Sequence, residues 1–190
     1  MPLNIPNLLT WMRILLIPLV VGVFYVPESW LTLPQKNLGA TVVFIAAALT
    51  DWFDGWLARR LGQTSAFGAF LDPVADKLMV TAALVVLVQL GRADAVIAIV
   101  IIGREIAISA LREWMAGLGA SRSVAVSFLG KLKTTAQMVA IPMLLHAGSM
   151  LGMDMPTMGS SLLDIAAVLT LWSMAYYLYR AWPEISARSR

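Results

Sequence analysis

Four aspartates are the residues of this sequence best suited to chemistry: Asp51, Asp54, Asp72 and Asp76 stand close together inside otherwise apolar segments. The first two are three residues apart and the last two are four apart, so within helices each pair would share one face. A carboxylate at membrane depth costs at least ~2.5 to 3.5 kcal/mol, and four like charges in one cleft do not all stay ionised alone. Divalent cations bound by carboxylate oxygens would offset both costs.

The rest of the composition restricts what such a metal site could be. The chain has no cysteine and a single histidine, His146. Thiolate zinc sites, cysteine nucleophiles and histidine-rich metal sites are therefore excluded. Oxygen ligands alone favour magnesium, manganese or calcium over zinc or copper.

The elements that would position these acids are transmembrane helices. Of the 190 residues, 59% are hydrophobic and 13% are charged, with a mean hydropathy of +0.79, whereas soluble domains are nearer 45 to 50% apolar and about 25% charged. A spanning helix needs roughly 20 mainly apolar residues, and six stretches qualify or nearly do. They lie near 8–26, 37–60, 66–90, 93–116, 124–148 and 159–182. Short connections predict one all-α integral membrane domain over residues 1–190, a six-transmembrane-helix bundle.

The basic residues predict its orientation. With a cytoplasmic N-terminus, eleven of the 14 basic residues fall on the cytoplasmic side or in the adjacent half of the membrane. These are Arg13, Arg59, Arg60, Lys77, Arg112, Arg122, Lys131, Lys133, Arg180, Arg188 and Arg190. The opposite loops hold Lys36 and Arg92, and Arg104 lies near the middle of the fourth span. This positive-inside asymmetry puts both termini and the turn at Gly62 in the cytoplasm, so the acids would line a polar cleft open to that side.

The net charge of +3 does not indicate nucleic-acid binding, because the basic residues flank membrane segments and do not form one soluble basic surface. They would instead face anionic lipid headgroups or an anionic substrate. The first apolar run lacks a basic leader and a small-residue cleavage pattern, which predicts a retained span and not a removed signal peptide.

The segment DWFDGWLARRLGQTSAFGAFLDPVAD, residues 51–76, contains Asp-x2-Asp-Gly-x2-Ala-Arg-x8-Gly-x3-Asp-x3-Asp. This pattern resembles the motif of the CDP-alcohol phosphotransferase family at all eight fixed positions. Further stretches resemble those bacterial members that transfer a phosphatidyl group from CDP-diacylglycerol to sn-glycerol 3-phosphate and release CMP. They are NIPNLLTWMR, FGAFLDPVADK, REIAISALREWMA and SVAVSFLGKLKTTAQM, and with the motif they span most of residues 4–140. The last quarter of the chain is less distinctive.

The resemblance implies a multi-pass homodimer in the bacterial cytoplasmic (inner) membrane, surrounded by membrane lipids, with two divalent metal ions, Mg²⁺ or Mn²⁺. Asp51, Asp54 and Asp72 would be metal ligands. Asp76 would be the general base for the acceptor hydroxyl within reach of a metal, or else only a fourth ligand. The residues implied to bind CDP-diacylglycerol are Gly55, Ala58, Arg59 and Gly68. Asn7, Thr10 and Arg13 resemble the family's N-terminal segment and would serve the nucleotide or headgroup region, although helix entry and interface anchoring explain them equally well.

An anionic acceptor requires a cationic pocket near the acids. The residues expected to bind glycerol phosphate are Arg112, Lys131, Lys133 and, less securely placed, Arg104. The competing interpretation for these residues is positive-inside anchoring. For Arg104 it is an ion pair inside the bundle, because Glu105 follows it and Glu113 is nearby.

Three classes of function remain open at this point. A phosphatidyltransferase of the same family could use serine, inositol phosphate or phosphatidylglycerol as its acceptor, since acceptor identity depends on residues outside the motif. A membrane prenyltransferase also binds a diphosphate through paired aspartate motifs and magnesium, but the Asp-Gly and Ala-Arg elements disfavour it. An ion transporter would explain acids at membrane depth, but not a cationic acceptor pocket beside them.

Overall fold

The computed structural model describes residues 5–61, 66–117, 128–150 and 152–188. Within these ranges the chain forms six α-helices, a short 3₁₀ turn, η1 (Val23–Tyr25), and a two-stranded antiparallel hairpin. The helices are α1 (Ile5–Gly22), α2 (Leu33–Leu61), α3 (Ala66–Gln89), α4 (Ala95–Gly117), α5 (Phe128–His146) and α6 (Met155–Arg188). Each predicted span coincides with one of these helices, so the all-α class and the helix order are confirmed.

The break expected between residues 148 and 159 is shorter than predicted. It contains β1 (Ser149–Met150) and β2 (Met153–Asp154), and α6 already begins at Met155. Gly152, with a φ of +78°, supplies the left-handed conformation that this tight turn needs. Asp154 directly precedes α6, and its side chain accepts a hydrogen bond from the hydroxyl of Thr157 in the first turn of that helix.

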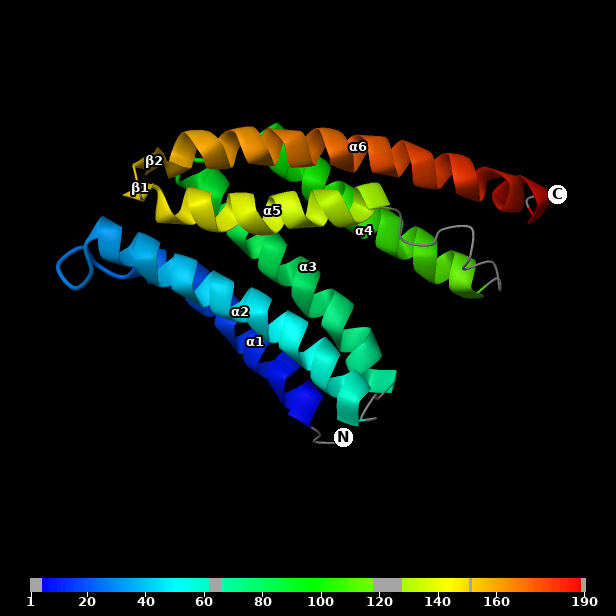
Figure 1. Ribbon diagram of the computed structural model, residues 1–190, viewed down its shortest axis with the longest axis horizontal. Coiled ribbons are helices and arrows are strands. Elements are labelled where there is room, and N and C mark those ends of the chain that lie inside the picture. The colour runs from blue at the N-terminus through cyan, green and yellow to red at the C-terminus, as the bar shows by residue number, and fades with distance from the viewer. Residues whose placement is uncertain (1–4, 62–65, 118–127, 151, 189–190) are drawn as a thin grey trace.

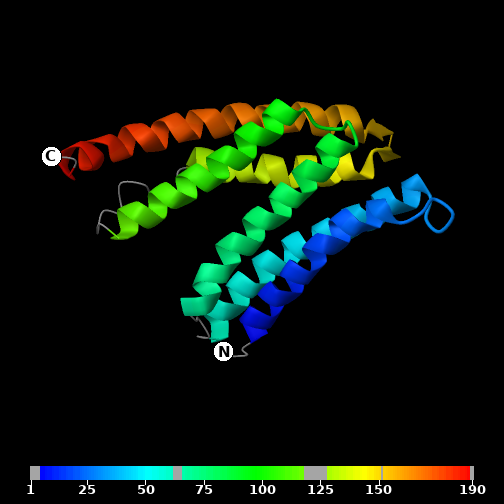
Figure 2. The same ribbon diagram turned by 180° about the vertical axis from the view of Figure 1, so that it is seen from behind.

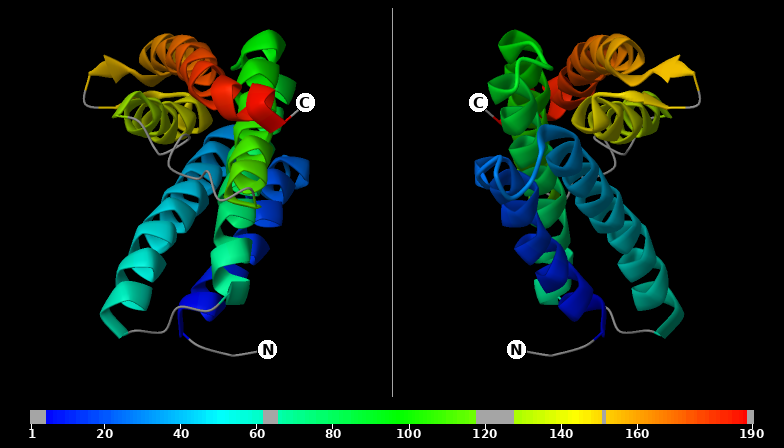
Figure 3. Two further views of the ribbon diagram at one scale, coloured as in Figure 1. Left: turned by 90° about the vertical axis from the view of Figure 1, so that its right-hand side faces the viewer. Right: turned by 90° about the vertical axis from the view of Figure 1, so that its left-hand side faces the viewer.

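The helices diverge from one end of the molecule (Figures 1 and 2). The connections that follow α1, α3 and α5 gather at this end, whereas the start of α1, the end of α2 and the end of α6 lie away from it (Figures 1 and 2). The start of α1 and the end of α2 lie at the lower edge of both views in Figure 3. Such alternation is what a chain that crosses a membrane repeatedly requires. The assignment of these ends to the cytoplasm and the outside remains a prediction.

The order of the helices along the chain does not decide which of them are neighbours. α5 and α6 form an antiparallel hairpin, but α4 packs chiefly on α6 and α2 packs on α5. α1 contacts both α2 and α3 more extensively than these two helices contact each other. α1 thus shares the interface between α2 and α3, the two helices that carry the four aspartates.

Polarity is distributed as in a protein surrounded by lipid. Large apolar side chains such as Leu15, Val96 and Ile99 are more than half exposed, and extensive exposed apolar surface is typical of a membrane or protein contact. Arg13 and Lys133, by contrast, are almost completely buried. Two helical windows among the described residues, Leu8–Tyr25 and Met155–Pro183, are by length and composition apolar enough to cross a membrane.

Arg92 lies in the connection between α3 and α4, and its side chain forms hydrogen bonds to α5 and α2 at the end where the connections gather. Its Nη1 donates to the carbonyl oxygens of Leu144 (3.3 Å) and Leu145 (3.0 Å) at the end of α5, and its Nη2 donates to Asn37 Oδ1 (2.9 Å) on α2. A cation close to helix C-terminal carbonyls is also favoured by the helix dipole. We interpret Arg92 as a structural residue, which agrees with its position far from the acids.

Replacing Arg92 with alanine is therefore expected to lower stability and spare activity. The loss of hydrogen bonds from a charged donor should cost about 2 kcal/mol, measured as a lower midpoint of thermal unfolding in detergent. Arg180→Ala is the matched control, because Arg180 is exposed on α6 and its removal should leave the midpoint unchanged. An unchanged midpoint in Arg92→Ala would contradict this interpretation.

Candidate active site

Two of the four predicted acids are held by side chains of α1. The Thr10 hydroxyl donates to Asp72 Oδ1 at 2.6 Å, and Arg13 Nη1 donates to Asp51 Oδ1 in an ion pair. Thr10 and Arg13 are three residues apart and share one face of α1, and both are essentially inaccessible to solvent. Thr10 and Arg13 thus contact the acids directly, whereas the sequence alone could not distinguish a position at the acids from anchoring at the membrane interface.

Asp76, the third described acid, is in a different situation. Its Oδ1 is buried and has no hydrogen-bond partner among the described residues, and the carboxylate lies within electrostatic range of both Asp51 and Glu105. A buried carboxylate oxygen without a donor, next to further negative charge, is costly unless a cation joins it. These residues fit a divalent cation on that ground. Among the described residues no three acidic or histidine side chains already converge as a complete metal cage.

A pocket of about 220 Å³ brings Asp76 together with most of the predicted acceptor cations. It lies between α3, α4 and α5, and its walls include Asp76, Arg104, Arg112 and Lys133. Residues from three helices, separated by up to 57 positions in the chain, thus surround one small space. The carboxylate predicted as a base and three cations predicted to bind a phosphate therefore line the same pocket.

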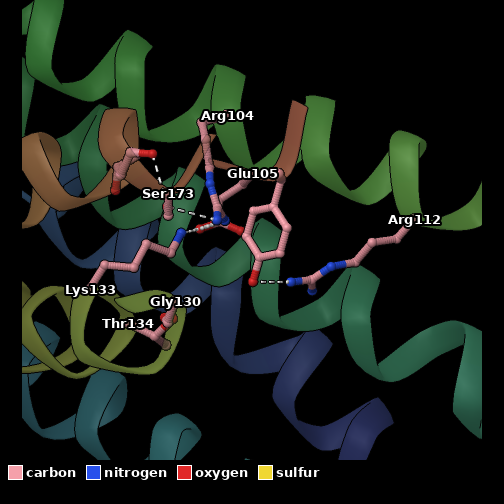
Figure 4. Close-up of polar contacts among 9 residues, drawn as sticks. Arg104, Glu105, Arg112, Gly130, Lys133, Thr134 and Ser173 are labelled. Carbon is pink, nitrogen blue, oxygen red and sulfur yellow. Dashed lines mark hydrogen bonds and ion pairs between the residues drawn. The ribbon is translucent and has the colours of Figure 1, made fainter. Parts of the chain in front are cut away.

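Glu105 lies at the centre of the cationic side of this pocket (Figure 4). Lys133 Nζ forms an ion pair and hydrogen bond with Glu105 Oε1, and Arg104 Nη1 is 3.6 Å from the same oxygen. Arg104 thus lies next to the expected ion-pair partner Glu105 and also lines the pocket, whereas its binding of glycerol phosphate stays a prediction. One carboxylate among the cations moderates their mutual repulsion in a buried setting.

Sequence reasoning missed the contribution of α6. Arg104 Nη2 donates to Ser173 Oγ at 3.0 Å, and Arg112 Nη2 donates to the Tyr177 hydroxyl oxygen at 3.1 Å. The guanidinium carbons of Arg104 and Arg112 lie 5.6 Å and 5.1 Å from the centroid of the Tyr177 ring, within cation–π range. The available signal was the spacing of Thr170, Ser173 and Tyr177, which places three polar side chains on one face of an otherwise apolar helix.

Several predicted site residues are not among the described side chains. These are Asp54, Gly55, Ala58 and Arg59 on α2 and Lys131 on α5. Gly68 is buried within α3. The predicted CDP-diacylglycerol site, which depends mainly on the α2 residues, thus stays a prediction, as does the part of Lys131 in the acceptor pocket.

A larger cavity of about 610 Å³ lies at the opposite end of the molecule, beside Arg92 and Asn37. Its lining contains none of the predicted site residues and no acidic side chain. Size alone would favour it as the site, but the smaller pocket between α3, α4 and α5 combines a carboxylate with cations. That combination is suited to binding a phosphate and accepting a proton next to it, so the smaller pocket is the better candidate site.

The chain is similar to known proteins over nearly its whole length. Residues 3–178 match the family model described as CDP-alcohol phosphatidyltransferase. The chain is 51% identical over 187 residues to proteins from Shigella flexneri serotype 5b (strain 8401) and Escherichia coli (strain K12), covering 97% of this chain and 98% of each relative. Both relatives are named CDP-diacylglycerol–glycerol-3-phosphate 3-phosphatidyltransferase.

Proposed function

We propose the reaction of this chain on the basis of its family: the chain belongs to the CDP-alcohol phosphatidyltransferase family. Its proposed reaction is transfer of the phosphatidyl group of CDP-diacylglycerol to sn-glycerol 3-phosphate, which gives phosphatidylglycerophosphate and CMP. The observation that carries this proposal is the pocket in which Asp76 faces Arg104, Arg112 and Lys133. The names of relatives at 51% identity support the same donor and acceptor.

The proposed metal site uses the acids of α2 and α3. Asp51, Asp54 and Asp72 would hold two divalent ions, Mg²⁺ or Mn²⁺, with Asp76 within reach, and the partnerless Oδ1 of Asp76 supports a cation there. When bound, such ions stabilise the charge that develops on phosphate oxygens and on the departing CMP. Dependence on divalent metals is general in this family.

The proposed roles of the chain's own residues follow from their chemistry. Asp76 accepts the proton of the glycerol hydroxyl, whose oxygen then bonds to the diacylglycerol-bearing phosphorus while the bond from that phosphorus to the oxygen of CMP breaks. This direct displacement needs no protein nucleophile. Arg104, Arg112 and Lys133, with Lys131 as a further predicted member, bind the phosphate of the acceptor, because planar guanidinium groups match phosphate oxygens through paired N–H donors.

The proposed setting is a homodimer in the bacterial inner membrane, with six spans and the pocket facing the cytoplasm. The exposed apolar side chains of the helices support the membrane setting. The excess of basic residues at the ends that carry the termini supports the orientation. A cytoplasmic pocket would give a water-soluble anion access to a donor that stays in the bilayer.

An acceptor competition assay tests this proposal. Purified protein with CDP-diacylglycerol and Mg²⁺ or Mn²⁺ should convert sn-glycerol 3-phosphate to a lipid product, separated by thin-layer chromatography, and release equimolar CMP. Serine, inositol phosphate and phosphatidylglycerol, each offered at the same concentration, should give at least ~10-fold less product, because they lack the exposed phosphate dianion or carry a bulkier group. Equal activity with serine, or no product with either metal, would overturn the proposal.

A further inference from the structure

We infer that Tyr177 is a positioning residue of the acceptor pocket: its ring and hydroxyl hold the guanidinium groups of Arg104 and Arg112 where they bind the acceptor phosphate. This inference rests on the proposed function, because it assigns Tyr177 a part in binding glycerol phosphate. Tyr177 itself is not among the residues that line the pocket. It would act through the two arginines and not by contact with substrate.

The side chains of Arg104 and Arg112 need contacts that fix their orientation. Arg104 and Arg112 are two turns apart on α4, and each has a buried Nε without a hydrogen-bond partner among the described groups. Both are cations in a largely buried space that Lys133 also enters, so mutual repulsion favours their separation. The contacts that oppose this repulsion come from Glu105 on the same helix and from α6.

Tyr177 supplies two kinds of contact from α6. Its hydroxyl oxygen accepts the hydrogen bond from Arg112 Nη2, and its ring lies near both guanidinium carbons. The electron-rich ring attracts both cations. Because both guanidinium groups contact the same ring, a change in the rotamer of one arginine would affect the other. The ring is completely buried against Ile108 and Met115, so its own orientation is set by packing.

The hydroxyl and the ring are separable by substitution. Tyr177→Phe keeps the packed ring and removes the hydroxyl that accepts from Arg112, so the KM for sn-glycerol 3-phosphate should rise roughly 10-fold, the size expected for one lost hydrogen bond to a charged group. The kcat and the KM for CDP-diacylglycerol should change less than ~2-fold. Tyr177→Leu should raise the acceptor KM further, since both cation–π contacts are also lost.

Tyr176→Phe is the matched control. Tyr176 is the neighbouring tyrosine, 43% exposed, and loss of its hydroxyl should leave both KM values unchanged. Thermal unfolding of Tyr177→Phe should stay close to that of the unsubstituted protein. A rise in both KM values together with a lower unfolding midpoint would show that Tyr177 is merely structural and would overturn the inference.

A double-mutant cycle with Arg112→Ala separates this inference from the function on which it rests. If Tyr177 acts through Arg112, adding Tyr177→Phe to Arg112→Ala should raise the acceptor KM no further, because coupled residues are not additive. Additive effects would overturn the positioning role. If Arg112→Ala itself leaves the acceptor KM unchanged, the proposed acceptor pocket fails. If Arg112→Ala raises it and Tyr177→Phe does not, only the inference fails.

Discussion

Replacing Asp76 with asparagine is expected to lower kcat by at least ~10³-fold while the protein still folds and still binds metal. A positioned general base contributes about 10² to 10⁴-fold to a proton transfer, and asparagine cannot accept the proton of the acceptor hydroxyl. The substitution keeps the size of the side chain in the pocket wall. It also removes a buried charge that has no hydrogen-bond partner at Oδ1 among the described groups, so stability should not fall.

The experiment separates a base from a mere ligand through two measurements. Turnover is followed as CMP release, and Mn²⁺ affinity is followed by the loss of the free-ion electron paramagnetic resonance signal. As a base near the metals, Asp76→Asn should abolish turnover with Mn²⁺ affinity reduced by no more than ~10-fold. Loss of metal binding parallel to the loss of turnover would show that Asp76 serves only as a ligand. Asp164→Asn, at an exposed aspartate on α6, should change neither quantity.

Replacing Arg112 with alanine is expected to raise the KM for sn-glycerol 3-phosphate by about 30- to 100-fold. The physical reason is the loss of charge-assisted hydrogen bonds to a phosphate in a partly buried pocket, an effect of about 2 kcal/mol or more. The kcat should stay within ~3-fold, because Arg112 is not expected to contact the reacting hydroxyl. The KM for CDP-diacylglycerol should not change, since its predicted binding residues lie on α2 and at Gly68.

Arg112→Lys provides the graded version of this test. Lysine keeps the positive charge but lacks the planar fork of N–H donors, so the acceptor KM should lie between those of the alanine variant and the unsubstituted protein. Arg180→Ala, at an exposed arginine on α6, controls for the loss of net charge and should leave both KM values unchanged. An equal rise in both KM values for Arg112→Ala would indicate a general defect of the pocket and contradict the assignment.

Much of the architecture could be predicted from the sequence because it depends on local patterns. Runs of about 20 apolar residues define helices wherever they sit, so the six expected segments coincide with α1 to α6. The boundary at α6 was less predictable, since it depends on the side-chain contact between Asp154 and Thr157 and on the turn conformation of Gly152, which composition alone does not reveal. Arg104 shows a second limit, because the sequence offered an ion pair with Glu105 and a place in the cationic pocket as alternatives and could not show that the two occur together.

By itself, the sequence determined the helices and the spacing of the four aspartates, because each follows from the pattern of one segment. Its loop charges predict the sidedness of the helices. Only the tertiary structure decided that α1 brings Thr10 and Arg13 to Asp72 and Asp51, and that α6 brings Ser173 and Tyr177 to the arginines of α4. Helices in lipid associate through close packing and hydrogen bonds without a hydrophobic force that selects partners. Side-chain packing between distant segments therefore decides which helices are neighbours and how each is rotated about its axis. No local sequence pattern contains that information.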